Sequence, residues 1–595
     1  MKKMILTGDE AVARGAWEAG CKVAAAYPGT PSTEILENIA LYKDDIYSQW
    51  ACNEKVAVEI VCGASIGGAR ALAAMKHVGL NVAADPLFTE SYVGVTGGVV
   101  IVTSDDPGCH SSQNEQDNRH YAVAAKLPML EPSDSAECKD FTKIAYEISE
   151  EFDTPVLLRM TTRICHSKGI VELGEREEIP IVPYKRRADK YVMLPAYARV
   201  RHANKERRLA EMEDYSNKCH MNRIIGDEGA KIGVISSGIS YQYAREVFDE
   251  KFGDKVKYLK LGFTNPMPRD MIKYFAADCD EVYIVEEGDG FIQAAVERLG
   301  IKCIGKQKIT PLGELNSEIV RRSFFGKGPA EGYKTDVQAP PRPPVLCAGC
   351  PHRGFFHALK KHKKDIVVFG DIGCYTLGCN SPLDGFDTTI CMGAGFSAAL
   401  GASRAFEMAG DGRKLFGLMG DSTFFHSGIT GLIDIIHSKA NVCACILDNS
   451  ITAMTGHQEN PGTERDLMGN EVPAMSIDKI VLATGLDPEH FVVVDPVDQK
   501  GMDAAVKAAV AVKGPFVIIA RRPCALLKEF IAANKGIHCE VNKEKCVGCT
   551  ACMSIACPAM AMKDGKAEIV DTDSCTGCTL CAQLCPKGAI ERVGV

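Results

Sequence analysis

The last 50 residues carry the pattern that most restricts how this chain can fold. Two cysteine runs occur there, Cys546-x2-Cys549-x2-Cys552-x4-Cys557-Pro558 and Cys575-x2-Cys578-x2-Cys581-x3-Cys585-Pro586. The start of the sequence has no signal-peptide pattern, so we expect a reducing, cytoplasmic location in which clustered thiols bind metal rather than pair as disulfides. A zinc ribbon is the simpler alternative, but it needs only four cysteines and no Cys-Pro pair.

The two runs form an internal repeat that resembles the two-cluster bacterial ferredoxin. The resemblance implies two [4Fe-4S] clusters, each held by three thiolates of one run and a fourth from the other. One cluster would use Cys546, Cys549, Cys552 and Cys585, and the other Cys575, Cys578, Cys581 and Cys557. The first run has one additional residue before Cys557, which leaves ligation by Cys557 open.

Residues 415–451 predict a strand–helix–strand unit whose two apolar strands are buried and parallel. Asp421 and Asn449 would then lie at the carboxyl ends of the strands, where open α/β sheets bind ligands, and their oxygens are typical Mg2+ ligands. An ordinary turn is the alternative. Gly420-Asp421-Ser422, followed by Asn449 at the end of the next strand, resembles the thiamine diphosphate motif. This implies that Asp421, Asn449 and the carbonyl of Ile451 hold Mg2+ against the diphosphate.

Residues 1–180 alternate helix and strand patterns, which predicts α/β structure. We expect one long helix from about residue 50 to Met75, with Glu54 near its start, where a carboxylate is usually a helix cap. The strings 27–32 and 53–55 resemble the pyrimidine-binding domain of 2-oxoacid:ferredoxin oxidoreductases. The resemblance implies that Glu54 activates the cofactor through its aminopyrimidine ring and that Thr30 lies beside the substrate.

Two further strings bear on the substrate. Residues 75–87 match the indolepyruvate branch of this family more closely than the pyruvate branch. Pyruvate enzymes present an Arg for the substrate after the strand that ends near residue 104, whereas Asp105 and Asp106 stand there in this chain. The resemblance therefore favours an arylpyruvate over pyruvate.

Composition changes suggest the remaining boundaries. We expect a pyrimidine-binding domain over 1–180, a charged helical connector over 181–227, and a transketolase C-terminal-like α/β domain over 228–338. After a Pro-rich linker, a diphosphate-binding α/β domain covers 345–535 and a ferredoxin-like α+β domain covers 536–595. The basic run in the connector is diluted by acidic residues, which favours a solvated face over a nucleic-acid arm.

Residues 347–352, Cys-Ala-Gly-Cys-Pro-His, contain a CxxC followed by His, which is half of a zinc-site pattern. The family resemblance instead implies a loop at the diphosphate-binding face. On that interpretation His352, Cys374 and His426 are candidates for the substrate and cofactor pocket. Each of them could equally be a core residue.

The composition excludes some partners. A net charge of -9 argues against nucleic acid, and no apolar run reaches the length of a membrane helix. The resemblance covers nearly the whole chain and is to the alpha subunits of the indolepyruvate branch. It implies oxidation of indolepyruvate or phenylpyruvate with CoA to aryl-acetyl-CoA and CO2, with electrons passing to ferredoxin, and it implies a small beta subunit. The alternatives are the same reaction on pyruvate or a branched 2-oxoacid, and a non-catalytic electron carrier.

Overall fold

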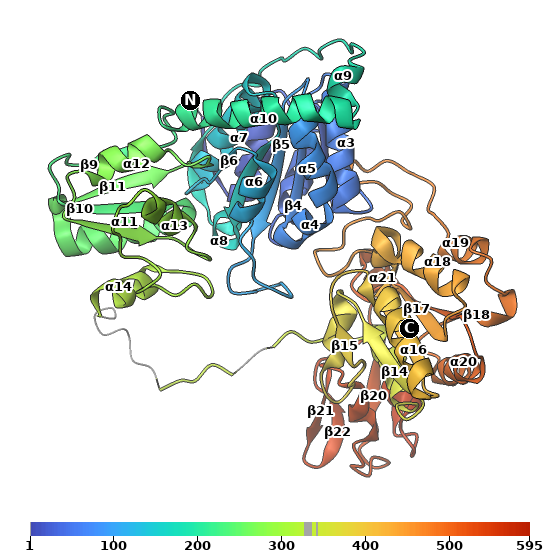
Figure 1. The fold of residues 1–595 in the computed structure, drawn as a ribbon. Coiled ribbons are helices and arrows are strands. Elements are labelled where there is room, and N and C mark those ends of the chain that lie inside the picture. The colour runs from blue at the N-terminus through green and yellow to red at the C-terminus, as the bar shows by residue number, and fades with distance from the viewer. Residues whose placement is uncertain (1, 327–335, 341–342, 595) are drawn as a thin grey trace. The chain divides into compact units, whose positions relative to one another are not determined.

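The computed structural model describes residues 2–326, 336–340 and 343–594. The chain divides into two compact units, residues 1–337 and 338–595. Figure 1 draws the first from blue to green and the second from yellow to red. Each unit has its own hydrophobic cores and is described by itself.

A seven-stranded sheet forms the centre of the first unit. Its order is β12-β6-β7-β5-β4-β2-β3, and all neighbours are parallel except β12 with β6. The strands are β2 (Val23–Ala26), β3 (Tyr47–Trp50), β4 (Ala71–Lys76), β5 (Val99–Asp105), β6 (Met129–Leu130), β7 (Val156–Thr161) and β12 (Phe263–Asn265). The inner strands β4, β5 and β7 are buried along their whole length, as parallel strands covered on both faces must be.

The helices of this part are α1 (Gly8–Glu18), α2 (Thr33–Ile39), α3 (Glu54–Ile66), α4 (His77–Val82), α5 (Ala84–Val93), α6 (Arg119–Ala125), α7 (Ser135–Glu151) and α8 (Thr162–His166). The prediction of one long helix to Met75 is wrong. Helix α3 ends at Ile66 because Gly67 and Gly68 follow, and Gly68 has a φ of +92°. The apolar run after these glycines is the buried strand β4.

A second sheet completes the first unit, with the order β13-β10-β11-β9. Its strands are β9 (Arg223–Gly226), β10 (Ile232–Ser237), β11 (Val256–Leu261) and β13 (Glu281–Val285), and its main helices are α11 (Gly238–Phe252), α12 (Arg269–Ala276), α13 (Phe291–Arg298) and α14 (Ser317–Phe325). Strand β9 falls within the predicted connector, whose charged run forms helix α10 (Pro195–Ser216). The buried Arg119 guanidinium joins the two parts by pairing with Asp117 and with Glu286 at 2.7 Å.

The second unit contains a six-stranded parallel sheet, β15-β14-β16-β17-β19-β18. Its strands are β14 (Ile366–Gly370), β15 (Thr388–Thr389), β16 (Lys414–Gly420), β17 (Val442–Asp448), β18 (Phe491–Val494) and β19 (Phe516–Arg521). Helices α15 (His352–Lys360) and α20 (Gln499–Ala511) share one hydrophobic core with the sheet, and α16 (Ala394–Ala409), α18 (Ile429–His437) and α19 (Ile477–Ala483) share the other. The predicted strand–helix–strand unit is confirmed, because β16 and β17 are buried, parallel neighbours.

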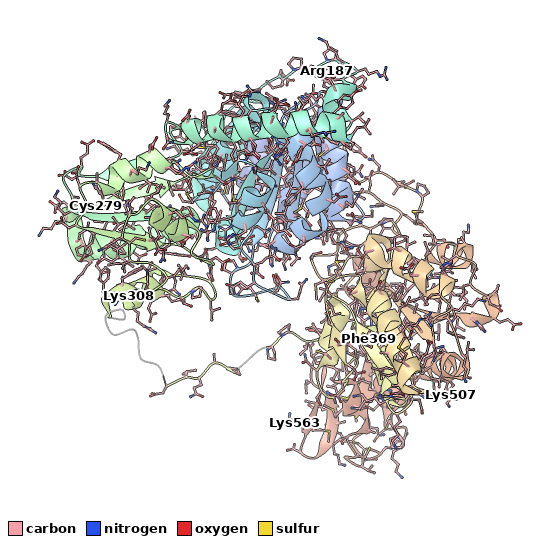
Figure 2. All side chains as sticks on the ribbon, viewed as in Figure 1. Arg187, Cys279, Lys308, Phe369, Lys507 and Lys563 are labelled. Carbon is pink, nitrogen blue, oxygen red and sulfur yellow. The ribbon has the colours of Figure 1, made fainter. Side chains whose placement is uncertain are left out.

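The cysteine-rich segment packs against helix α15 and the residues before α20 within the same unit. It has two small antiparallel pairs, β20 (His538–Val541) with β23 (Ile590–Val593) and β21 (Met560–Lys563) with β22 (Lys566–Ile569). Figure 2 marks the sheet with Phe369 and the β21–β22 hairpin with Lys563. Over the residues described, no helix is long and apolar enough to cross a membrane.

Candidate functional site

Three oxygen groups converge where β16 and β17 end. Gly420 pairs with Leu447 in the register of the two strands, so Asp421 and Asn449 follow at the same edge of the sheet. Ser450 has a φ of +63°, and its N–H donates to Asp448 Oδ1 at 3.1 Å. This turn brings the carbonyl of Ile451 back toward Asn449.

The arrangement fits a hard cation. Asn449 Oδ1 lies 2.7 Å from the carbonyl oxygen of Ile451 and 3.2 Å from Asp421 Oδ1. If the Asn449 amide were rotated by 180°, its nitrogen would stand in this position and would donate to the Ile451 carbonyl and to Asp421 Oδ1. In an octahedral Mg2+ site with bonds of about 2.1 Å, neighbouring ligand oxygens lie about 2.9 Å apart. The Asn449 oxygen therefore lies at about the separation of neighbouring Mg2+ ligands from each of the other two oxygens.

Charge at this edge is unusually concentrated. Burial, and then the neighbouring Asp448, raise the pKa of Asp421 to about 7. Asp448 is paired with Arg521, whose Nε donates to its carboxylate at 2.6 Å. Arg521 also pairs with Asp478. Asp421 is thus the carboxylate at this edge that a bound cation would compensate.

The other predicted pocket residues lie around this edge. Thr452 donates to Ser422 Oγ at 2.9 Å, and Tyr375 joins the loop through a 3.4 Å contact between its hydroxyl and Thr423 Oγ1. The ring of His352 packs edge-on against Tyr375 with centroids 5.7 Å apart, and burial lowers the pKa of His352 to about 4. His352 is therefore a neutral ring at physiological pH.

His426 lies in a π-helical turn, Phe424–Gly428, directly before α18. Its Nδ1 is 3.0 Å from Ser427 Oγ, and the ring is buried. Such π-turns are frequent at functional sites. His426 therefore belongs to the same loop as Asp421 and Ser422.

Four thiols from three separate segments come together beside this loop. Burial, then Cys524 and Cys347, raise the pKa of Cys374 to about 11. Burial also raises the pKa of Cys350, to which Cys374 and Cys347 contribute. The backbone N–H of Cys524 donates to the carbonyl of Asn449 at 3.0 Å, which ties the thiol set to the proposed cation site. Cys524 was not singled out in the sequence, because it lies 150 residues beyond Cys374 and has no second cysteine beside it.

The spacing of these thiols bears on the zinc alternative. Four thiolates around zinc, with Zn–S bonds of about 2.3 Å, would lie about 3.8 Å apart. Among the residues described, three or more metal-binding side chains lie within 4.8 Å of one another at two places only, both in the first unit. Neither place includes a thiol of the Cys347 set or any of the eight C-terminal cysteines.

Several of the C-terminal cysteines lie near one another. One cavity is lined by Cys546, Cys549, Cys552 and Cys585. For the second set, burial raises the pKa of Cys578, and Cys557 and Cys575 add to the shift. Backbone N–H groups already face the sulfurs, with Ala567 donating to Cys546 at 3.4 Å and Ala589 to Cys585 at 3.2 Å. A third such donor is the N–H of Cys539, 3.3 Å from Cys575 Sγ.

Glu54 occupies the first turn of α3 in the first unit. Asn53 caps the helix by accepting the N–H of Val56 at 2.9 Å, and Glu54 is 6% exposed. The side-chain cap of α3 is thus made by Asn53. A Cβ added at Gly79 would lie 2.6 Å from Glu54 Oε1, so the first turn of α4 holds the carboxylate in place.

This close approach gives a testable prediction. Gly79→Ala should displace Glu54 and lower kcat by about 10-fold to 100-fold, because a misplacement of about 1 Å can cost that much. Steady-state turnover with bound thiamine diphosphate checks it. Gly63→Ala is the matched control, because no atom lies within 4 Å of its added Cβ. Equal kcat in the two variants would contradict the positioning role of Gly79.

Thr30 lies in the loop after β2, beside a buried lysine. Lys76, at the end of β4, donates to the carbonyl of Ser111 at 2.6 Å, and Ser111 in turn donates to the carbonyl of Thr30 at 3.4 Å. Burial lowers the pKa of Lys76 to about 8, with Asp106 acting against the shift. The string 75–87 contains this lysine, and a cation at the end of an apolar run is the signal that could have identified it.

Asp105 and Asp106 have structural partners. Arg159 Nε donates to Asp105 at 2.8 Å, and Asp106 accepts from Ser111 N at 2.8 Å and from Thr162 Oγ1 at 2.8 Å. The two carboxylates thus fix the loop after β5.

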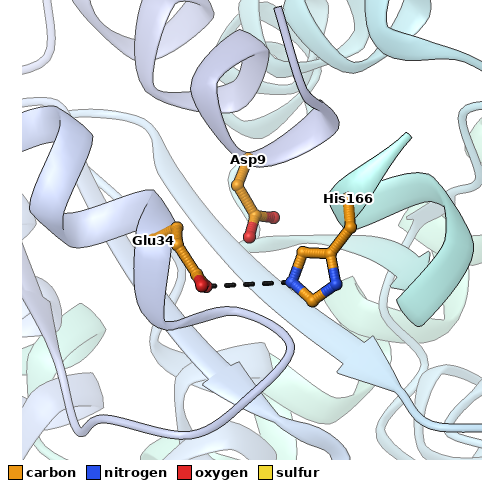
Figure 3. A group of neighbouring side chains, drawn as sticks. All are labelled: Asp9, Glu34 and His166. Carbon is orange, nitrogen blue, oxygen red and sulfur yellow. Dashed lines mark ion pairs between the residues drawn. The ribbon is translucent and has the colours of Figure 1, made fainter. Parts of the chain in front are cut away.

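Figure 3 shows a second acidic group, Asp9, Glu34 and His166, whose ligand atoms lie within 4.8 Å of one another. Glu34 and His166 form an ion pair at 3.9 Å. Burial and the nearby Glu34 raise the pKa of Asp9 well above its usual value, and the hydrogen bond with Glu34 raises the pKa of His166. These shifts bring the charges of the group closer to balance.

Three family models match parts of this chain. The family model "Pyruvate flavodoxin/ferredoxin oxidoreductase, thiamine diP-bdg" matches residues 14–223, "Thiamine pyrophosphate enzyme, C-terminal TPP binding domain" matches residues 371–520, and "4Fe-4S binding domain" matches residues 568–591. The matched ranges contain Glu54, the Asp421–Asn449 edge and the second cysteine run.

Relatives cover the whole chain. The indolepyruvate oxidoreductase subunit IorA of Archaeoglobus fulgidus is 41% identical over 99% of this chain and 97% of its own length. The protein of the same name from Methanothermobacter thermautotrophicus is 39% identical over 100% of this chain and 98% of its own length. Among solved structures, the chain is similar to a 2-oxoglutarate:ferredoxin oxidoreductase from Magnetococcus marinus, with a TM-score of 0.47 and 20% identity over 54% of this chain and 64% of that one.

Proposed function

This chain belongs to the thiamine diphosphate-dependent 2-oxoacid:ferredoxin oxidoreductases, together with the IorA subunits, and from this premise we propose that it oxidises arylpyruvates. The reaction converts indolepyruvate or phenylpyruvate and CoA into aryl-acetyl-CoA and CO2, and two ferredoxins each accept one electron. The observation that carries the proposal is the combination, in one unit, of three converging oxygens at the ends of β16 and β17 with three sets of cysteine thiols.

Asp421, Asn449 and the Ile451 carbonyl would hold Mg2+ and, through it, the diphosphate of the cofactor. When bound, thiamine diphosphate supplies the carbon nucleophile and the electron sink for decarboxylation. Glu54 would hydrogen-bond the aminopyrimidine ring and move a proton there. Its burial keeps water from competing for that hydrogen bond.

Three cysteine sets would carry the electrons. The two C-terminal sets would hold [4Fe-4S] clusters with the ligands that the ferredoxin resemblance implies. The third set, Cys347, Cys350, Cys374 and Cys524, lies beside the proposed cation site and would hold a cluster nearest to the cofactor. Neutral His352 and buried His426 would line the pocket between them without adding charge. Because each cluster accepts one electron at a time, the two electrons of each turnover would leave singly.

Lys76 would bind the substrate carboxylate in place of the Arg that pyruvate enzymes use. It lies in the string shared with the indolepyruvate branch, and its ammonium group reaches the loop of Thr30 through Ser111. Thr30 would then lie beside the ketone of the substrate. A small beta subunit would complete the enzyme, since the relatives are themselves subunits.

The role of Lys76 predicts a change in KM. Lys76→Met should raise the KM for the 2-oxoacid about 10-fold to 100-fold, because a hydrogen bond to a charged group contributes about 1.5–3 kcal/mol. In the unsubstituted protein KM should also rise above pH 8, because Lys76, with a pKa of about 8, loses its charge there. Initial rates between pH 6.5 and 9.5 check both effects. Lys43→Met, at an exposed lysine, is the control, and a KM for Lys76→Met equal to that of Lys43→Met would contradict the assignment.

Product analysis tests the proposed function. The chain is purified without oxygen together with its small partner subunit, and indolepyruvate, phenylpyruvate, pyruvate and 2-oxoglutarate are supplied with CoA and ferredoxin. We expect aryl-acetyl-CoA, one CO2 and two reduced ferredoxins per arylpyruvate, and at least tenfold lower kcat/KM for the other acids. Turnover mainly of pyruvate would remove the proposed specificity. No acyl-CoA from any 2-oxoacid, in protein loaded with all cofactors, would favour a non-catalytic electron carrier.

A further inference from the structure

Arg353 is a buried cation without a carboxylate partner among the residues described. Its side chain is 2% exposed and follows His352 in helix α15. Burying an unpaired guanidinium is expensive, because the charge loses its hydration. The structure must therefore supply either an anion or a complete set of hydrogen-bond acceptors beside it.

The hydrogen-bond acceptors are backbone carbonyls from two different parts of the unit. Arg353 Nε donates to the carbonyl of Cys347 at 2.9 Å, and Nη2 donates to that of Leu346. Nη1 donates to the carbonyl of Ile555 at 2.8 Å and also to that of Ala556. One side chain thus joins the loop of the Cys347 set to the residues immediately before Cys557.

The backbone before Cys557 turns toward Arg353. Ala556 lies in the four-residue spacing between Cys552 and Cys557, directly before Cys557, and adopts a left-handed φ of +53°. The carbonyls of Ile555 and Ala556 both accept from Arg353. This part of the longer spacing therefore provides a docking point for Arg353, and Cys557 is held from outside the ferredoxin-like segment.

A second contact supports the same junction. Gly349, between Cys347 and Cys350, has a φ of +71°, and a Cβ added there would lie 2.2 Å from Thr576 Oγ1. Thr576 follows Cys575 directly, so the loop of one thiol set touches the loop of the other. A backbone hydrogen bond from Gly349 also acts on the Cys557 thiol.

The charges around Arg353 are thiols. Burial lowers the pKa of Arg353, and the groups that oppose this shift are Cys557, Cys350, Cys347 and Cys578, in that order. Two of these belong to the second C-terminal set and two to the Cys347 set. Each set carries net negative charge when its thiolates bind a cluster, and this is the anion that a buried guanidinium requires.

We propose that Arg353 is a positioning residue that lies between the Cys347 set and the Cys557 set, holds Cys557 as a ligand, and stabilises the reduced state of the cluster that Cys557 binds. This rests on the proposed function only in taking the cysteine sets to hold clusters. Each electron that reaches this cluster makes it one charge more negative, and the fixed cation offsets that charge. When both C-terminal sets hold clusters, each electron would leave this cluster for ferredoxin in a single-electron step, so two such steps would complete one turnover.

The test measures cluster reduction potentials in the αβ protein by dithionite titration followed by electron paramagnetic resonance, without substrate. Arg353→Gln should lower the potential of one C-terminal couple by at least 59 mV, which is tenfold in the reduction equilibrium of a one-electron couple. Lys587→Gln is the matched control, because this exposed lysine lines the cavity of Cys546, Cys549, Cys552 and Cys585. It should leave the Arg353-sensitive couple unchanged.

Arg353→Lys separates charge from geometry. It keeps the cation but loses the fork that reaches four carbonyls. We expect its potential to stay close to that of the unsubstituted protein, while an iron chelator removes the Cys557 cluster at least tenfold faster. If Arg353→Gln loses that cluster altogether and keeps the other, the positioning role is supported.

Two results together would overturn this inference in protein that retains its clusters. The potentials would be unchanged in Arg353→Gln, and the rate of iron removal by the chelator would be unchanged in Arg353→Lys. The proposed function would then still stand. Absence of every [4Fe-4S] signal from the unsubstituted anaerobic protein would instead overturn the proposed function and this inference together.

Discussion

Glu54→Gln is expected to bind thiamine diphosphate and to lose about 100-fold to 10,000-fold in kcat, the usual contribution of a positioned acid–base group. The amide keeps the size of the side chain and can still fill the space beside Gly79. It cannot accept and return the proton that activates the cofactor. Binding, measured by tryptophan fluorescence or calorimetry, should change by less than a factor of ten.

The control for this prediction is Glu59→Gln. Glu59 lies on the same helix, is exposed, and pairs with Lys55. Its substitution should leave kcat within a factor of two, because exposed ion pairs contribute little. If Glu54→Gln turns over as fast as Glu59→Gln, then Glu54 is a structural residue of the first turn of α3.

Asp421→Asn is expected to weaken binding of thiamine diphosphate at fixed Mg2+ by at least about 100-fold, because even indirect partners of a metal site contribute 10-fold to 100-fold. The amide cannot neutralise the cation. Titration of the cofactor at several Mg2+ concentrations checks this. Asp434→Asn is a suitable control, since Asp434 is exposed on α18. Equal cofactor affinity in the two variants would contradict the cation site.

The same substitution should have the opposite effect on the cofactor-free protein. The folded-state pKa of Asp421 is raised to about 7, so its ionisation opposes folding increasingly as pH rises from about 4 to 7, and fully above 7. Asp421→Asn removes this cost. Without cofactor, its Tm should therefore exceed that of the unsubstituted protein at pH 8 and equal it at pH 4. A lower Tm at pH 8 would show that the carboxylate is already compensated.

Local sequence patterns predicted the parts of the site that lie within one strand–helix–strand unit. Asp421 and Asn449 could be placed because parallel neighbouring strands end at the same edge of a sheet. The helix around Glu54 was predicted too long, since a run of small residues satisfies both helix and buried-strand patterns. In the folded chain, Gly67 and Gly68 end the helix at Ile66, so the residues after them form a strand.

Long-range features could not be predicted in this way. Cys524 joins Cys347 and Cys374 only because β19 pairs beside β17 in the folded sheet. Arg353 stands in a helix whose pattern is ordinary, and its importance follows from acceptors 200 residues away. A single sequence shows spacing within a run, whereas these contacts depend on the tertiary arrangement.

Cluster absorbance under strictly anaerobic conditions gives the decisive test. The chain and its small partner subunit are loaded with thiamine diphosphate and Mg2+, CoA is added, and indolepyruvate is mixed in while absorbance near 420 nm is followed. We expect rapid bleaching with the unsubstituted protein and none with Glu54→Gln, whose clusters should still bleach with dithionite. If neither indolepyruvate nor any other 2-oxoacid bleaches the fully loaded protein, the thiamine site does not supply electrons to the clusters.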